Sequence, residues 1–201
     1  IDELLVGWEP VLDRLRITYT GGNGPLGSQA AYGPPTMVLA IAPSDPPAST
    51  SAIVTSPWTR NEHGALAGVK STSYAENVRA LAYATERNAS ESILLNTAGN
   101  VCEGTGTNIF AVFDGEVVTP PLSSGPLAGV TRDLLLEWCD VVEADFTLAD
   151  ATKAEEVFLT SSLRDVQGVH RWDDLAFPAP GVKTAEIAEI FARRSGDDVD
   201  P

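Results

Sequence analysis

One stretch of this 201-residue chain, residues 96–138, constrains the fold more than any other. It reads NTAGNVCEGTGTNIFAVFDGEVVTPPLSSGPLAGVTRDLLLEW. Two apolar runs flank Asp114-Gly115, a pair typical of a two-residue β-hairpin turn. The loop from Ser123 to Gly129 leads into an apolar-periodic segment that begins at Thr131, which predicts a helix. The stretch therefore predicts a hairpin followed by a helix, with the acid Glu103 in a glycine-rich setting ahead of the hairpin.

The rest of the chain alternates between strand-like and helical patterns. Val78, Leu81, Ala82 and Thr85 recur at helical spacing, and Ser73 is a candidate N-cap for that helix. We expect helices over 74–87, 131–139, 148–153 and 184–194, and strands over 14–20, 36–42, 52–56, 92–96, 108–113, 116–119, 141–146, 156–160 and, as an edge strand, 166–172. Mixed strands with interspersed helices predict an α+β fold. We expect residues 1–60 to form a smaller piece with a connector, and residues 61–201 to form a large domain.

Composition excludes several classes of function. The formal net charge is −15, so nucleic acid is a poor partner, because phosphate backbones require a basic face. No apolar run is long enough for a membrane span, and no signal peptide is visible. Two unpatterned cysteines favour a reduced cytoplasm, and two histidines are too few to indicate a metal site. The first residue, Ile1, is not methionine, and we expect the chain to be part of a longer polypeptide.

Lys70 is the first candidate functional residue. The sequence has only three lysines, and Lys153 and Lys183 lie in polar helical segments that indicate solvated side chains. Lys70 follows Ala65-Leu66-Ala67-Gly68-Val69 and has no carboxylate within five residues. A lysine in such surroundings can act as an amine nucleophile or form a Schiff base. The alternative is an ordinary surface lysine in a loop.

Glu103 and two clusters of donors are the other candidates. A buried Glu103 would require a cation or several hydrogen-bond donors, whereas a turn glutamate would point to water. Val130 and Thr131 open a helix, where N–H groups and the helix dipole favour an anion. Thr160-Ser161-Ser162 places hydroxyl groups at a strand end. Ordinary capping is the alternative for both clusters.

Three segments together resemble the class IV, or fold-type IV, aminotransferases, which use pyridoxal 5′-phosphate (PLP). The family includes branched-chain aminotransferases, D-amino acid aminotransferases and 4-amino-4-deoxychorismate lyases. The segments are VKSTSYAENVRALAYA (69–84), NTAGNVCEGTGTNIFAVFDGEVVTPPLSSGPLAGVTRD (96–133) and EVFLTSSLRDV (156–166). Their order and spacing agree with the family across most of residues 52–169. The resemblance implies a fold-type IV large domain and, in residues 1–60, the remainder of a smaller N-terminal α/β domain.

The resemblance also implies roles for individual residues. Lys70 corresponds to the lysine that holds PLP covalently, and Glu103 to the acid that pairs with the pyridine nitrogen. These two are the expected catalytic residues. The implied cofactor-binding set comprises Lys70, Tyr74, Glu103, Asn108, Leu127, Val130, Thr131 and Ser162. Within that set, Leu127 lies against the ring face, and Val130, Thr131 and Ser162 bind the phosphate.

The implied activity is transfer of an amino group between a small amino acid and a 2-oxo acid by a cytoplasmic homodimer. Two alternatives stay open: a 4-amino-4-deoxychorismate lyase that releases pyruvate and 4-aminobenzoate, and a non-catalytic domain that retains the scaffold. Family members also carry a phosphate-binding arginine in the small domain. Arg14, Arg16 and Arg60 do not match its motif, and we assign that role to none of them.

Overall fold

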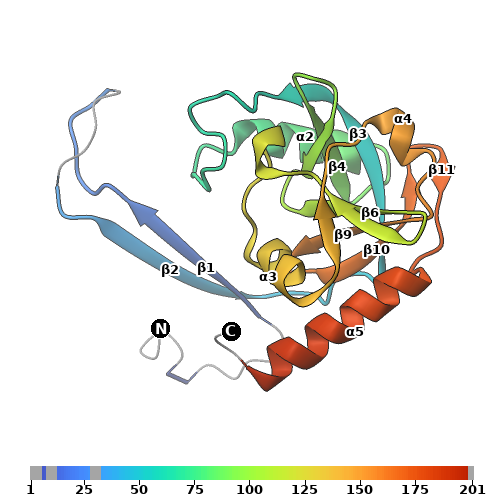
Figure 1. Cartoon of the computed structure of the whole chain (residues 1–201). Helices are drawn as coiled ribbons and strands as arrows, with labels where there is room; N and C mark the ends of the chain where they lie inside the picture. The colour runs from blue at the N-terminus through green and yellow to red at the C-terminus, as the bar shows by residue number, and fades with distance from the viewer. Residues whose placement is uncertain (1–5, 8–12, 28–32, 199–201) are drawn as a thin grey trace. The chain divides into compact units, whose positions relative to one another are not determined.

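The computed structural model describes residues 6–7, 13–27 and 33–198, and the chain divides into two compact units, residues 1–47 and 48–201 (Figure 1). In the first unit, β1 (Asp13–Thr20) pairs antiparallel with β2 (Thr36–Pro43). The alternating pattern of residues 14–20 predicted β1, and the apolar run of residues 36–42 predicted β2. Large apolar side chains of this pair stay exposed, among them Ile17 and Met37. The pair therefore has little core of its own among the described residues.

The second unit is built on one mixed sheet. Along the sheet the strands follow the order β5-β4-β3-β10-β9-β6-β7-β8, and β11 pairs with β10. The parallel pairs are β3 with β4, β3 with β10, and β7 with β8, whereas the other neighbours run antiparallel. The bounds are β3 (Thr50–Arg60), β4 (Glu91–Asn96), β5 (Val101–Gly104), β6 (Asn108–Phe113), β7 (Glu116–Thr119), β8 (Val141–Glu143), β9 (Glu156–Ser161), β10 (Asp165–Trp172) and β11 (Leu175–Ala176).

Helices cover the sheet and form several of the connections between its strands. α3 and α5 pack on β9, and α5 also contacts β10, whereas α2 packs on β3 and β4. Their bounds are α2 (Ala75–Thr85), α3 (Val130–Trp138), α4 (Leu148–Ala151) and α5 (Val182–Asp197), with a 3₁₀ turn η1 (Leu122–Ser124). In the described part of the chain, no helix is both long and apolar enough to cross a membrane.

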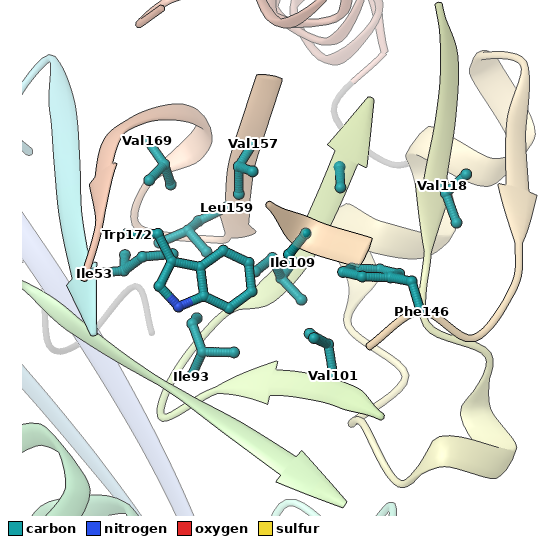
Figure 2. Close-up of a cluster of buried hydrophobic side chains, with 12 residues drawn as sticks. Ile53, Ile93, Val101, Ile109, Val118, Phe146, Val157, Leu159, Val169 and Trp172 are labelled. Atoms are coloured by element: carbon teal, nitrogen blue, oxygen red, sulfur yellow. The ribbon is translucent and has the colours of Figure 1, made fainter. Parts of the chain in front are cut away.

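Two apolar clusters occupy opposite faces of the central strands. Side chains alternate between the faces of a strand, so Ile109 and Ala111 of β6 join one cluster while Phe110 and Val112 join the other. In the first cluster, the Trp172 ring lies among Ile53, Ile93, Ile109 and Leu159 (Figure 2). In the second, Phe110 stacks on Phe158 at 4.8 Å between centroids, beneath Leu135 of α3 and Ile187 of α5. Burial on both faces explains the continuous apolar runs of β6 and β9.

The predicted hairpin turn at Asp114-Gly115 is confirmed. Phe113 pairs with Glu116 across it, and Asp114 and Gly115 both have positive φ, at 50° and 79°. Positive φ at both central residues is the geometry of a type I′ turn.

Other sequence-based predictions were wrong in detail. β10 was expected to be an edge strand, yet it lies between β3 and β9. Ser73 was expected to cap α2, but the N-cap is Tyr74, which makes no side-chain capping bond. β5 was not predicted, and β3 extends to Arg60 instead of ending at Ser56. Because β3 belongs to the large sheet, the division between the units falls after Pro47 and not near residue 60.

Candidate functional site

All eight cofactor-binding residues predicted from the sequence line one cavity of about 200 Å³ in the second unit. The segment before α2, the end of β5, the start of β6, the loop before α3 and the end of β9 meet there. The eight are Lys70, Tyr74, Glu103, Asn108, Leu127, Val130, Thr131 and Ser162. The fold thus brings together residues up to 92 positions apart, from Lys70 to Ser162. Their individual roles stay predictions.

Glu103 occupies the third position of β5 and is 9% exposed. Its Oε1 lies 3.1 Å from Nη2 of Arg60, and its Oε2 accepts a hydrogen bond of 2.8 Å from the Leu127 N–H group. Burial raises the pKa of Glu103 above its ordinary value of 4.5, while the Leu127 N–H group and Arg60 act in the opposite direction. The carboxylate is therefore held in a fixed orientation at the cavity wall.

Arg60 is a site residue that the sequence analysis missed. It ends β3, and besides Glu103 it contacts Asn77 of α2, whose Oδ1 accepts from its Nη2 at 3.3 Å. The requirement that a buried Glu103 meet a cation was a signal for such a residue. Nothing in the local sequence identified Arg60 as that cation, because it lies 43 residues before Glu103.

Lys70 lines the same cavity from the segment between Gly68 and α2. Gly68 has a φ of 71°, a left-handed conformation that other residues rarely adopt, and it turns the chain just before Lys70. Within the described residues, Lys153 and Lys183 form ion pairs at 3.3 Å and 2.8 Å, whereas Lys70 forms none. Its Nζ lies 5.8 Å from the centre of the Tyr74 ring. Lys70 thus lines the cavity without an ion pair to any carboxylate of the described residues.

The N-terminus of α3 faces the cavity, and no side chain of the described residues caps it. Gly129 is the N-cap, and Val130 and Thr131 form the first turn. A Cβ at position 129 would lie 2.1 Å from Oδ1 of Asn108, so any larger residue there requires the Asn108 side chain to move. Asn108 holds the preceding loop, because its Nδ2 donates to the Leu127 carbonyl oxygen at 2.8 Å. Asn108 therefore positions the helix entry, a finer role than the sequence alone indicated.

The strand end of β9 completes the cavity with Thr160, Ser161 and Ser162. Thr160 is 1% exposed, and its hydroxyl has no hydrogen-bond partner among the described residues. A buried unpaired hydroxyl is uncommon and requires an explanation, such as a ligand or an ordered water. Sequence analysis noted this hydroxyl cluster but selected only Ser162 from it.

A second, larger cavity of about 450 Å³ adjoins the first. The two share Tyr74, Asn77, Glu103 and Leu127 as lining residues, and Arg60 and the segment from Gly64 to Val69 line the larger one. The site thus offers one compact space beside the N-terminus of α3 and a wider space that shares Glu103 as a wall.

The family model described as amino-transferase class IV matches residues 3–172. The chain belongs to the class IV aminotransferase family. This family is PLP-dependent and contains aminotransferases, which use amino acids and 2-oxo acids, as well as lyases.

Two relatives illustrate the range of names within this family. A Methanocaldococcus jannaschii protein with a provisional branched-chain-amino-acid aminotransferase name is 34% identical over 168 residues, covering 79% of this chain and 58% of that protein. The aminodeoxychorismate lyase of Vibrio harveyi is 38% identical over 109 residues, covering 52% of this chain and 40% of the lyase. The chain thus spans about half the length of the curated relatives that it matches.

Solved structures support the fold. The branched-chain aminotransferase of Thermoproteus uzoniensis, crystallised with norvaline, superposes with a TM-score of 0.83 at 24% identity, over 90% of this chain and 64% of that one. The Thermobaculum terrenum branched-chain amino acid aminotransferase in its PLP form gives a TM-score of 0.77 at 24% identity, over 92% of this chain and 66% of that one. The predicted α+β, fold-type IV class is therefore confirmed.

Proposed function

We propose that this chain carries the catalytic groups of a PLP-dependent aminotransferase that moves an amino group between a small amino acid and a 2-oxo acid. One observation supports this proposal above all. A lysine with no ion pair among the described residues, a buried carboxylate and the N-terminus of α3 line a single cavity of about 200 Å³.

The chemistry of these groups fits PLP. The Lys70 amine suits the aldehyde carbon, and the Glu103 carboxylate suits a protonated ring nitrogen. The N–H groups of Val130 and Thr131, with the hydroxyls of Thr131 and Ser162, suit a phosphate. The hydroxyl of Thr160 at the same strand end has no hydrogen-bond partner among the described residues, which leaves it available to an acceptor. When bound, PLP supplies an electron sink for the bonds at the substrate α-carbon.

Each protein group has a distinct task in this proposal. With PLP bound, Lys70 Nζ would accept the α-proton of the substrate. Glu103 stabilises positive charge on the ring nitrogen, and Arg60 and the Leu127 N–H group keep the carboxylate oriented for that purpose. The α3 N-terminus anchors the anionic end, so that the reacting carbon stays within reach of Lys70.

A 4-amino-4-deoxychorismate lyase is the second candidate. The observation that favours it is the similarity to the Vibrio harveyi protein that bears the lyase name. Both reactions begin with removal of the α-proton by the lysine amine, and they differ in whether a leaving group is then expelled. The groups around the cavity serve either outcome.

The test begins with the cofactor. Incubation with PLP is expected to give a yellow protein. Borohydride reduction and peptide mapping should then mark Lys70, because Lys153 and Lys183 are held in ion pairs with Asp150 and Glu186. Label on either of those two lysines instead would contradict the assignment, and a colourless protein would favour a non-catalytic domain.

Activity assays then separate the two reactions. Amino transfer among D-alanine, branched-chain amino acids and 2-oxoglutarate supports the first candidate. Release of pyruvate and 4-aminobenzoate from aminodeoxychorismate, without amino transfer, supports the second.

The proposal includes a homodimer in the cytoplasm. Leu66 and Val69 beside the larger cavity are 55% and 54% exposed, which suits a surface that a partner subunit covers. Sedimentation analysis of the purified protein is expected to give twice the monomer mass.

A further inference from the structure

Glu91, the first residue of β4, is a buried carboxylate that the proposed reaction does not use. It is 2% exposed. Its Oε1 accepts hydrogen bonds from the backbone N–H groups of Ser92 and Thr105, both at 2.9 Å, and from the Thr105 hydroxyl. Its Oε2 accepts from the Gly106 N–H group at 3.3 Å and from the Thr107 hydroxyl at 3.2 Å. Four of these five donors belong to the loop of residues 104–107, which follows Glu103.

The conformation of the loop of residues 104–107 depends on the Glu91 side chain. Burial of a carboxylate is costly unless a cation or several donors compensate it. Within the described residues, no arginine or lysine forms an ion pair with Glu91, so the loop donors compensate its burial. The N–H groups of Thr105 and Gly106 make their hydrogen bonds with Glu91. Loss of the carboxylate would leave several loop donors unpaired at once.

Glycine at position 104 reflects the same packing. A Cβ there would lie 2.9 Å from Cδ of Glu91 and 2.2 Å from Oγ1 of Thr107. The Glu91 side chain therefore lies directly against the backbone that follows Glu103. A shift of Glu91 would move the end of β5 and with it the Glu103 carboxylate.

A second path of contacts leads from the loop to Glu103. The Thr105 carbonyl oxygen accepts from Nδ2 of Asn77 at 2.6 Å, Asn77 accepts from Arg60, and Arg60 pairs with Glu103. The contacts that start at Glu91 thus return to Glu103 through α2 and β3. All four loop residues line the smaller cavity, and Glu91 itself does not.

We propose that Glu91 is a positioning residue of the PLP site: it fixes the loop of residues 104–107 as a wall of the cavity and orients Glu103, without touching the ligand. This inference rests on the proposed function of the cavity as a PLP site.

A matched pair of variants tests the inference. Glu156 is also a buried carboxylate, 7% exposed, that accepts from two backbone N–H groups and a threonine hydroxyl. Its donors, Lys183 and Thr184, begin α5 and do not line either cavity. Glu91→Gln and Glu156→Gln should both lower the thermal stability of the chain, because both remove one acceptor oxygen from fixed donors.

Only Glu91→Gln is expected to change the cofactor site. In PLP titrations followed by absorbance, its Kd should rise by about tenfold, the effect of losing one hydrogen bond to a charged group. The visible circular dichroism of the bound cofactor should also change, since it reports how the cofactor is oriented. The Glu156→Gln variant should keep the wild-type Kd and spectrum. Equal Kd values and spectra for both variants would overturn the inference.

A second pair covers the case in which Glu91→Gln does not fold. Thr105→Ser keeps the hydroxyl that donates to Glu91, whereas Thr105→Val removes it. Weaker PLP binding by the valine variant alone supports the inference, and equal binding by both variants overturns it.

Failure of the proposed function is recognised separately, by a wild-type chain that binds no PLP. Hydrogen exchange of the Thr105 amide then decides the inference. Loss of protection in Glu91→Gln and not in Glu156→Gln supports it, and equal exchange rates overturn it.

Discussion

Gly129→Ala tests the junction between β6 and the N-terminus of α3. Gly129 has φ −80° and ψ 135°, which alanine adopts without backbone strain. The new methyl group would, however, lie 2.1 Å from Oδ1 of Asn108 and 3.3 Å from its Cγ. Because these distances are shorter than van der Waals contact, the Asn108 side chain must move, and its bond to the Leu127 carbonyl oxygen must break.

The expected loss of stability follows from the loss of the hydrogen bond between Asn108 and the Leu127 carbonyl oxygen. Leaving a buried polar pair unsatisfied costs about 1–3 kcal/mol, and alanine is also the weaker N-cap by about 0.5 kcal/mol or more. We therefore expect the free energy of unfolding, measured in urea, to fall by about 1.5–3.5 kcal/mol. Gly106→Ala is the matched control, since a Cβ there meets nothing within 4 Å. The control should change stability by less than about 0.5 kcal/mol.

A double-mutant cycle assigns the cost to its cause. In an Asn108→Ala background the Oδ1 atom is absent, so Gly129→Ala should cost about 1–2 kcal/mol less than in the wild type. The same destabilisation in both backgrounds would refute the collision as its cause. A stability of Gly129→Ala equal to that of Gly106→Ala would refute the geometry itself.

Two further predictions concern the charge and the hydroxyl at the site. Arg60→Met removes a group that opposes the rise in the pKa of Glu103, so an NMR titration should give a still higher pKa, and a fall would refute the pairing. Since the folded pKa already lies above 4.5, the contribution of Glu103 to stability is greatest below pH 4.5 and decreases as pH rises through the folded pKa. Thr160→Val should not lower the stability of the cofactor-free chain, because its hydroxyl has no partner among the described residues, yet it should raise the Kd for PLP by about tenfold. An unchanged Kd would mean that this hydroxyl faces no ligand.

Local patterns predicted the central strands and the turn well. The apolar runs of β6 and β9 identified both strands, because burial on both faces leaves no polar alternation to obscure them. The Asp114-Gly115 pair identified its turn, since few residues accept positive φ at both positions. β5 escaped prediction, because Val101–Gly104 is only four residues long and contains an acid and a glycine, which have weak strand preference.

Long-range pairing was the main source of error. β10 pairs with β3, and Gly168 lies opposite Thr50, 118 residues away, so no local signal distinguishes a central β10 from an edge strand. Arg60 was missed for the same reason, because its partner Glu103 lies 43 residues away in the sequence. The resemblance to class IV aminotransferases supplied a site set that lines one cavity, but it gave no reason to select Arg60, Thr160 or Glu91. Those three became visible only through burial and hydrogen-bond partners.

The architecture explains why the candidate groups lie where they do. A strand buried on both faces has no place along its length for an unpaired amine, carboxylate or anion, because each would be desolvated without compensation. Reactive groups must therefore stand where strands end and helices begin. Arg60 ends β3, Asn108 begins β6, Ser162 follows β9, and Val130 begins α3. Glu103 stands next to the last residue of β5, where its pairing with Leu94 of β4 fixes the backbone and its contact with Arg60 fixes the carboxylate.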